Sequence, residues 1–189
     1  MHRGLAMAVL ALSALACSHL KGPVGLGEVL DFELSDLEGE RVRLRDHRGQ
    51  VVLVAFWAPW CRPCAEELPR LSDLYTRLQA EGLEVLAVAA QSSAEEVDAF
   101  LDGQALPFPS LFDPDARLMQ RLGLFDIPSW VLVDAYGRVV HVHAATPDDA
   151  FWRLEWVVRR GLGQPELAPA NARPVRPAKS DMASGASSL

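Results

Sequence analysis

Two long apolar runs constrain the fold of this 189-residue chain more than any other feature. The first covers residues 51–57 without a polar residue, and the second covers residues 83–90 with Glu84 as its one charged member. Such runs predict strands buried on both faces of a sheet, since a strand with one wet face alternates. Between them, leucines recur at helical spacing over residues 68–78, and Gly82 ends the pattern. The order predicts two parallel strands joined by a helix that covers one face of the sheet.

The segments on either side of this unit predict a mixed sheet. A hairpin is expected over residues 30–44, because two alternating stretches flank a polar turn at 36–39. Ser93 and Glu96 form a capping box that opens a helix reaching Leu101. Further expected elements are a strand at 108–112, a helix at 116–122, a second hairpin at 130–143, and a last helix that starts at 146–149 and ends at 159–161. The fold class is therefore α/β, with a central mixed sheet and helices on both faces.

Charge and cysteine content exclude several classes of function. The chain carries a net charge of −7 and no basic run, which argues against binding to nucleic acid, because phosphates are neutralised by clustered Lys and Arg. Half of the residues are hydrophobic, enough for a real core. Three cysteines are too few for a disulfide-stapled scaffold or for a structural zinc site made of cysteines alone.

The N-terminus has the pattern of an export signal. A basic start is followed by an apolar run over residues 5–16, which is shorter than the ~20 residues of a membrane-spanning helix. Residues 1–16 are thus expected to be a signal peptide. Ala14-Leu15-Ala16-Cys17 also resembles the bacterial lipobox, in which the cysteine is lipidated and becomes the first residue. An ordinary signal peptide with an incidental cysteine is the alternative.

This pattern predicts a simple division of the chain. Residues 17–24 form a tether, residues 25–163 form one domain, and the Pro/Ala/Ser-rich residues 164–189 form a disordered tail. Cys17 is the odd thiol once the other two cysteines pair, and lipidation would explain it. We therefore expect an exported lipoprotein that is anchored to a membrane and faces the periplasm or extracytoplasmic space.

The pair Cys61 and Cys64 carries the chemistry. The two cysteines lie directly after the first buried strand, where the long helix begins. A helix N-terminus offers partial positive charge and free N–H groups, both of which stabilise a thiolate, and Arg62 adds a cation. Because the thiolate attacks in thiol–disulfide exchange, Cys61 is expected to be the nucleophile and Cys64, one turn inside, the resolving thiol.

A C-x-x-C pair is also half of a zinc site. The chain has no second cysteine pair, and His47, His141 and His143 do not have zinc-finger or ribbon spacing. The strand–C-x-x-C–helix context therefore favours a redox site with no metal and no cofactor. A copper-binding chaperone module that uses both cysteines and a histidine stays open as the alternative, although His141 and His143 are more simply half-exposed strand residues.

The run Phe56-Trp57-Ala58-Pro59-Trp60-Cys61-Arg62-Pro63-Cys64, followed by Glu67-Leu68-Pro69, resembles the thioredoxin superfamily. More narrowly, it is similar to membrane-anchored TlpA/ResA-like thiol–disulfide oxidoreductases. The resemblance covers residues 25–163 and implies a thioredoxin-like fold with an N-terminal hairpin and an inserted strand–helix segment. It also implies that Pro128 is a cis-proline facing the disulfide, and that Ile127 offers backbone hydrogen bonds to an extended substrate.

By the same resemblance, Trp60, Arg62 and Pro63 border the substrate together with the cis-proline loop. Trp57 is expected to pack in the core. The chain departs from the pattern where thioredoxins carry a buried aspartate, because Ala55 occupies that position. Ser129-Trp130 also replaces the usual Thr-rich pair. The Thr-x-x-Cys site of peroxiredoxins is missing before Cys61, so peroxidase activity is not expected.

Glu67 is the best substitute for the missing acid. At ~100° per residue it lies about 60° around the helix from Cys64, whereas Glu66 lies roughly 160° away. The family has a functional glutamate at this position, and a solvated helix-surface carboxylate is the alternative. Together these features predict an enzyme that reduces disulfides of other exported proteins. The family resemblance implies substrates in cytochrome c maturation or with metal-site thiols, and electrons from a membrane dithiol donor.

Overall fold

The computed structural model describes residues 23–102, 104, 106–144 and 150–164, and its centre is a five-stranded mixed sheet. The strands lie in the order β5-β4-β3-β6-β7. Strand β3 (Val51–Trp57) pairs in parallel with β4 (Leu83–Ala90) along its whole length. Both strands have the predicted bounds and are almost wholly buried, which confirms the central pair.

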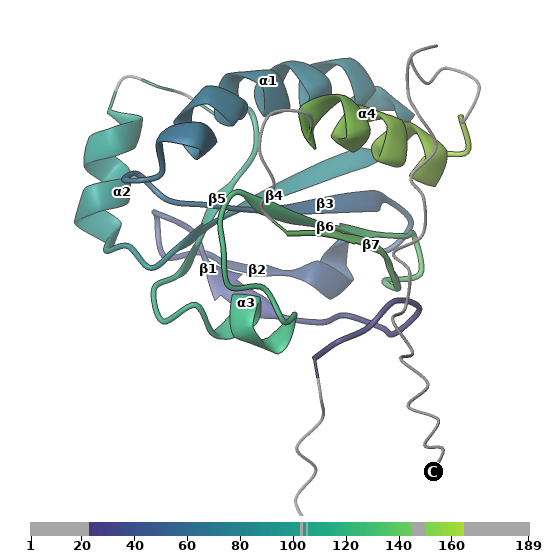
Figure 1. The fold of residues 1–189 in the computed structure, drawn as a ribbon, viewed down its shortest axis with the longest axis horizontal. Helices are drawn as coiled ribbons and strands as arrows, with labels where there is room; N and C mark the ends of the chain where they lie inside the picture. The colour runs from purple at the N-terminus through teal and green to yellow at the C-terminus, as the bar shows by residue number, and fades with distance from the viewer. Residues whose placement is uncertain (1–22, 103, 105, 145–149, 165–189) are drawn as a thin grey trace, which may run out of the picture.

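Helices cover the sheet on both faces (Figure 1). Helix α1 and helix α4 lie on one face, and the short helix α3 lies on the other with the N-terminal hairpin. Each face buries its own apolar cluster against the sheet. The remaining elements are α1 (Arg62–Leu78), α2 (Ala94–Leu101), β5 (Ser110–Asp113), α3 (Arg117–Arg121), β6 (Ser129–Val133), β7 (Val139–His143) and α4 (Ala150–Gly161). The predicted thioredoxin-like α/β class is confirmed.

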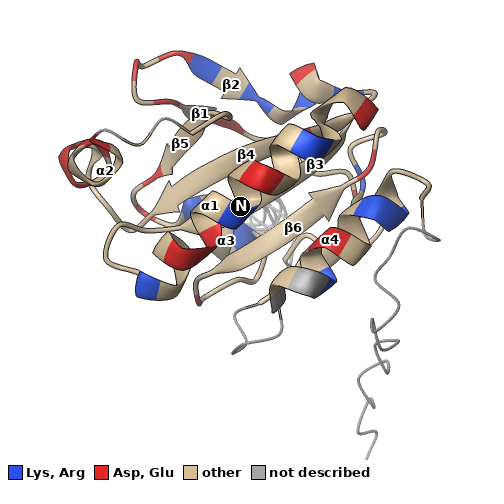
Figure 2. Cartoon of the chain, turned by 90° about the horizontal axis from the view of Figure 1, so that it is seen from above, with Lys and Arg blue, Asp and Glu red and all other residues tan. Residues whose placement is uncertain are grey.

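Charge follows the same layering. In Figure 2 the Lys, Arg, Asp and Glu residues lie on the helices, the hairpin and the loops, while the broad central strands are mostly uncharged. Strands buried on both faces cannot hold unpaired charges without a large desolvation cost. The apolar runs of the sequence therefore decide which elements form the middle layer.

The N-terminal hairpin forms with shorter strands than the sequence suggested. Strand β1 (Glu33–Ser35) pairs antiparallel with β2 (Arg41–Arg43), and the chain then enters a 3-10 helix at Leu44–His47. The Asp36 carboxylate accepts the backbone N–H groups of Glu38 and Glu40, which closes the predicted turn. Leu44 is fully buried, so core packing rather than the strand ladder fixes its conformation.

The other local predictions hold with small shifts. The capping box of Ser93 and Glu96 is formed and opens α2 at the predicted residue. β5 begins two residues later than expected, and α3 is shorter at both ends. The proposed start of α4 at 146–149 lies outside the described residues, as do the signal peptide, Cys17, most of the tether and all of the tail beyond Gln164. No helix within the described ranges is long and apolar enough to cross a bilayer.

One arginine pins the N-terminal segment to the sheet. Arg48 donates to the carbonyl oxygens of Leu30 and Leu44, and its guanidinium lies against Gly137 in the turn between β6 and β7. A Cβ at Gly137 would meet the guanidinium carbon at 2.1 Å, and its φ of +82° also favours glycine. The Asp134–Gly137 turn predicted from the sequence is thus held in place by a residue far from it in the chain.

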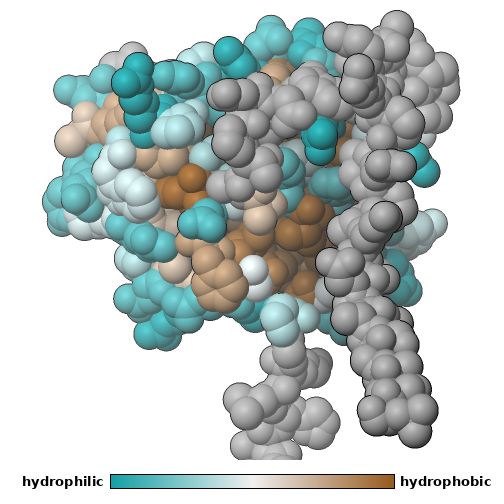
Figure 3. Space-filling model, viewed as in Figure 1, coloured by the Kyte–Doolittle hydropathy of each residue, from teal (hydrophilic) through white to brown (hydrophobic). Residues whose placement is uncertain are grey.

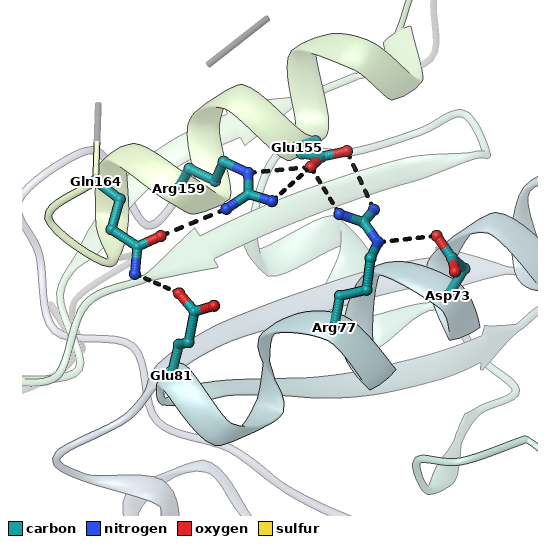
Figure 4. A network of polar contacts seen from close by, with 6 residues as sticks. All are labelled: Asp73, Arg77, Glu81, Glu155, Arg159 and Gln164. Carbon is teal, nitrogen blue, oxygen red and sulfur yellow. Dashed lines mark hydrogen bonds and ion pairs between the residues drawn. The ribbon is translucent and has the colours of Figure 1, made fainter. Parts of the chain in front are cut away.

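A polar network joins α1 to α4 across the top of the sheet (Figure 4). Arg77 donates from two nitrogens to Glu155 at 2.9 and 3.2 Å, and its Nε donates to Asp73. Arg159 donates to the same glutamate at 3.0 Å and to Gln164, which in turn contacts Glu81. Arg77 thus contacts the Glu155 carboxylate through two nitrogens, the bidentate geometry that gives the strongest arginine–carboxylate pairs. The network therefore fixes the angle between the two helices.

Replacing Glu155 with Gln should loosen this contact. The hydrogen bonds from Arg77, joined by those from Arg159, hold the pKa of Glu155 below its ordinary value of 4.5, against the effect of burial. The stabilisation is therefore present above pH 4.5 and is lost as the pH falls through the lower pKa of the folded state. We expect a melting temperature about 2–4 °C lower at pH 7, with the difference shrinking in acid, as measured by calorimetry.

Glu66→Gln serves as the control, because the one ion pair of Glu66 within the described residues is with the largely exposed Arg62 of its own helix. It should leave the melting temperature nearly unchanged. Equal melting temperatures for Glu155→Gln and the parent chain at pH 7 would show that the network adds nothing to stability.

Candidate functional site

A disulfide between Cys61 and Cys64 opens α1. The two sulfurs are 2.06 Å apart, and the Cα atoms are 5.3 Å apart. Cys61 is the N-cap residue, and its Sγ accepts the backbone N–H of Cys64 at 3.3 Å. The sulfur therefore occupies the place where a Ser or Asp oxygen usually caps a helix. The same N–H group is available to stabilise a Cys61 thiolate after reduction.

The two cysteines differ in position along the helix. Cys61 lies at the cap and Cys64 lies inside the first turn, facing the core, with 1% of its surface exposed. Pro63 occupies the first turn, where its missing N–H costs nothing. Arg62 is 91% exposed at its side chain and lies 3.4 Å from Glu66. The predicted cation is thus beside the site, but it is shared with a carboxylate and screened by water.

A small cavity lies beneath Cys64. It has a volume of about 20 Å³, enough for about one water molecule. Ala55 of β3, Cys64 and Glu67 of α1, and Pro128 all line it. A larger side chain at position 55 would fill this space, so the alanine that replaces the thioredoxin aspartate helps to leave it open. Glu67 and Cys64 thus line one and the same cavity.

Glu67 is half-buried in this environment. Burial raises the pKa of its carboxyl above the ordinary value of 4.5, and the positive charge of Arg70 opposes the shift. A raised pKa brings the group closer to neutral pH, where general acids and bases work best. The carboxyl can therefore exchange a proton with a neighbouring thiol, either directly or through one water molecule.

The loop before β6 forms the other wall of the site. The Ile127–Pro128 peptide bond is cis, as the resemblance implied. Ile127 is half-buried and packs against the apolar clusters on both faces of the sheet. Within the described residues, neither its N–H nor its carbonyl takes part in a hydrogen bond. An extended peptide could therefore pair with this backbone in the manner of strand addition; its role, like those of the other site residues, remains a proposal.

Trp60 flanks the disulfide on the outside. Its side chain is 58% exposed, and its Nε1 donates to the carbonyl oxygen of Gln91 at 3.3 Å. Gln91 follows β4 and has a φ of +54°, a conformation that few non-glycine residues adopt. By contrast, Trp57 is buried and packs against Phe100 of α2. The two tryptophans thus have the separate placements that the sequence suggested.

The strand histidines stack on a tryptophan. His141 and His143 lie on one face of β7, and their rings are 5.0 and 4.8 Å from the ring centre of Trp130, nearly parallel to it. Burial, joined by the charge of His143, lowers the pKa of His141 below 6.5. Among the described residues, no group of three His, Cys, Asp or Glu side chains could hold a metal ion.

Several residues of the site were not foreseen. Trp130, Phe151 and Leu154 complete the cavity beneath Cys64 from β6 and α4, and Gln91 supplies the carbonyl that holds Trp60. Trp130 follows the cis-proline loop and was noted only as a departure from the family pattern, whereas Phe151 and Leu154 lie in a helix where apolar residues indicate only core packing. The signal exists only once the topology brings β6 and α4 next to the start of α1.

The fold and the disulfide at the start of α1 define a thioredoxin-like thiol–disulfide oxidoreductase. Within that class, the chain belongs to the AhpC/TSA family, which it matches over residues 27–142. Over 116 residues it is 37% identical to the thiol-disulfide oxidoreductase ResA of Geobacillus thermodenitrificans and 34% identical to ResA of Halalkalibacterium halodurans. These stretches are 61% of this chain and 67% and 66% of those proteins, so it spans about two thirds of their length.

Solved structures show the same fold. A protein from Chlorobium tepidum assigned as the thiol:disulfide interchange protein DsbE superposes with a TM-score of 0.69 at 29% identity, covering 74% of this chain and 99% of its own. The thioredoxin domain of a thiol-disulfide oxidoreductase from Bacteroides vulgatus superposes with a TM-score of 0.60 at 25% identity, covering 71% of this chain and 98% of its own.

Replacing Glu67 with Gln should slow thiol–disulfide exchange and alter its pH dependence. The amide cannot accept a proton from Cys64, so the branch of the pH–rate profile that reports the carboxyl should disappear. A rate decrease of about tenfold to a hundredfold near pH 7 is expected. Stopped-flow measurement of exchange with a small disulfide between pH 4 and 9 checks this.

Stability provides the control for that variant. Because the pKa of Glu67 is raised on folding, the folded state binds more protons than the unfolded state, and stability falls as the pH rises from 4.5 through the raised pKa. Glu67→Gln should thus be slightly more stable than the parent at pH 7 and equal to it in acid. If the pH–rate profile of Glu67→Gln is unchanged, Glu67 takes no part in the exchange reaction.

Proposed function

We propose that this protein reduces disulfide bonds of other exported proteins while anchored to a membrane. The observation that carries the proposal is the Cys61–Cys64 pair capping α1, beside the cis-proline loop and above the cavity lined by Glu67. Those features provide a stabilised thiolate, an edge for an extended substrate, and a group that can move a proton. The similarity to thiol-disulfide oxidoreductases supports the same reaction.

The first step forms a mixed disulfide. The thiolate of reduced Cys61 attacks one sulfur of the substrate disulfide, a Cys61–substrate bond forms, and the other substrate sulfur leaves as a thiolate that takes up a proton. The N–H of Cys64 and the dipole of α1 favour the attacking thiolate. The substrate segment pairs with the backbone of Ile127, with Trp60 and Pro63 at its side.

The second step releases the reduced substrate. Glu67 accepts the proton of the Cys64 thiol, and the resulting thiolate attacks Sγ of Cys61. The Cys61–Cys64 bond forms as the mixed disulfide breaks, and the second substrate sulfur leaves and is protonated. Two electrons have then passed from the enzyme dithiol to the substrate. A dithiol of a membrane donor returns the enzyme to its reduced form by the same exchange in reverse.

The substrate class and place of action rest on the sequence resemblance. It favours cysteine pairs that must be reduced before they can bind a cofactor or metal, as in cytochrome c maturation or at metal-site thiols. Disulfides persist in an oxidising compartment. Exported proteins that need free thiols therefore require a reductant of this kind. The lipobox at Cys17 would keep the enzyme near its membrane donor.

The roles of the two thiols can be separated with single variants. In Cys64→Ser, substrate attacked by Cys61 cannot be released, so mixed disulfides should accumulate on non-reducing gels. In Cys61→Ser, few or none should form, since Cys64 lies inside the first turn and is the less exposed of the two buried thiols, at 1% against 5% for Cys61. Iodoacetamide at neutral pH should likewise modify Cys61 before Cys64 in the reduced protein. Equal modification together with trapping through Cys64 would reverse the assignment.

The anchor has its own test. Mature protein should begin at Cys17 with attached acyl chains and should sediment with membranes, because several chains hold a protein stably at a bilayer. Cys17→Ser should either release the protein or block its processing. Mass spectrometry of the N-terminal peptide checks this, and an unmodified Cys17 or a cleavage elsewhere would contradict the lipoprotein assignment.

A further inference from the structure

The large apolar side chains that remain exposed fall mainly at two ends of the molecule. Among the described residues they are Leu26, Val29, Trp60, Phe125, Tyr136 and Val140, and Figure 3 shows brown apolar side chains reaching the surface on one face of the molecule. Trp60 precedes the redox cysteines, and Phe125 lies three residues before the cis-proline. Leu26, Val29 and Tyr136 form a second group, which we name the tether-end patch.

Backbone and side-chain hydrogen bonds hold the tether-end patch together. The segment after residue 25 pairs antiparallel with the start of β7: Val29 bridges Arg138, and Gly27 donates its N–H to Val139. Arg138 also donates to the carbonyl of Gly27 at 3.1 Å. Tyr136 is the exposed tip of the β6–β7 turn, whose shape is fixed because the Asp134 carboxylate accepts the N–H groups of Tyr136 and Arg138.

The patch lies at the opposite end of the sheet from the disulfide. β6 begins at Ser129, beside the cis-proline, and ends at Val133, just before the turn that carries Tyr136. Five residues of strand span about 17 Å, so the two groups of exposed apolar residues are separated by at least about that distance along the sheet. Figure 1 shows the purple N-terminal segment beside the β6–β7 turn, away from the start of α1.

We propose that the tether-end patch rests on the lipid surface to which the protein is anchored, so that the disulfide points away from the bilayer. This orientation rests on the proposed lipidation of Cys17. The described chain begins at Pro23, three residues before Leu26; Pro23 lies against Gly123, and the N–H of Val24 donates to the carbonyl of Arg121 at the end of α3. The six residues from Cys17 to residue 22 can span at most about 20 Å. The lipid anchor therefore keeps both the patch and the end of α3 within reach of the membrane, and the apolar patch, not the tether alone, selects the face that meets the bilayer.

The chemistry of the patch suits a bilayer surface. Leu26 and Val29 offer apolar side chains, Tyr136 has the apolar ring and polar tip typical of membrane interfaces, and exposed Arg138 can pair with lipid phosphates. The neighbouring acids Glu28 and Asp134 accept backbone N–H groups. Because a short tether raises the effective concentration of the membrane, three side chains suffice to set orientation without binding lipid strongly on their own.

Cysteine labelling in membranes from cells that express the full chain tests the proposal. Leu26→Cys, Tyr136→Cys and Phe125→Cys are each made in a Cys61→Ser/Cys64→Ser background, which leaves one free thiol once Cys17 is acylated. The three parent side chains are 68%, 78% and 75% exposed, so without a membrane contact a bulky, membrane-impermeant maleimide should react with all three at similar rates. Rates are normalised to the same variant unfolded in guanidinium.

We expect positions 26 and 136 to react about fivefold or more slowly than position 125 while the protein is membrane-bound. Adding Val29→Asp to the position-136 variant should remove this protection, because an acidic side chain at this exposed position is repelled by a lipid surface while Arg138 keeps its contact with Gly27. Similar rates at all three positions, or protection that survives the Asp change, would overturn the proposal.

The outcome is separable from the proposed function. Sedimentation and the mass of the N-terminal peptide report the anchor, insulin reduction by the parent chain reports the enzyme, and the labelling ratio reports the patch. If the protein is acylated and active but is labelled equally at positions 26, 136 and 125, only the proposed orientation is contradicted. Protein that is active but not acylated overturns the anchor and the orientation together.

Discussion

The redox site depends on one hydrogen bond at the start of α1, from the N–H of Cys64 to the sulfur of Cys61. The first N–H groups of any helix lack partners within the helix, and an oxygen of Ser, Thr, Asp or Asn usually satisfies one of them. Here a reactive sulfur does so. A reduced Cys61 thiolate would be a stronger acceptor for this N–H than the disulfide sulfur, so the helix cap and the nucleophile favour the same charged form.

The cap is only as firm as the helix behind it. Leu68, Leu71 and Leu74 bury the inner face of α1 against β3 and β4, and the Arg77–Glu155 contact ties its far half to α4. The helix therefore cannot shift along the sheet without losing core packing. The position of the sulfur relative to the cis-proline loop is set by these contacts, several turns away from the chemistry.

In this site the acid lies on helix α1 rather than on the central strand β3. Ala55 on β3 removes the carboxyl that thioredoxins hold in the sheet, and the space it leaves is shared by Cys64 and Glu67 of the neighbouring helix. Burial acts on the helix carboxyl as it would on one in the strand, by raising its pKa. Arg70, one turn further along α1, limits the shift. The pKa of the acid is thus set by burial against the sheet and α4 and by a charge on its own helix.

Local signals predicted the central strands and α2 with their correct bounds, because an apolar run or a capping box contains its own evidence. The hairpin and α3 were placed less well, since their ends are set by tertiary contacts: Leu44 by its burial, and α3 by the Asp113 carboxylate that accepts the N–H groups of Arg117 and Leu118. The cavity could not be predicted in full. Glu67 was found from helix geometry, but Trp130 and Leu154 enter only through the order of the strands and the docking of α4.

The proposed orientation constrains the partners of the enzyme. With the tether-end patch on the lipid surface, the disulfide stands off the bilayer by about the length of β6, near 17 Å or more. A donor whose dithiol lay at the level of the lipid headgroups could not reach Cys61 while the patch stays in place. A membrane donor of the kind proposed must therefore carry its dithiol on a segment that rises from the membrane, or the domain must lift off on the proposed tether, which is long enough to allow it. Weak contact through three side chains suits that exchange, because a patch that bound lipid strongly would hold the active site away from its own reductant.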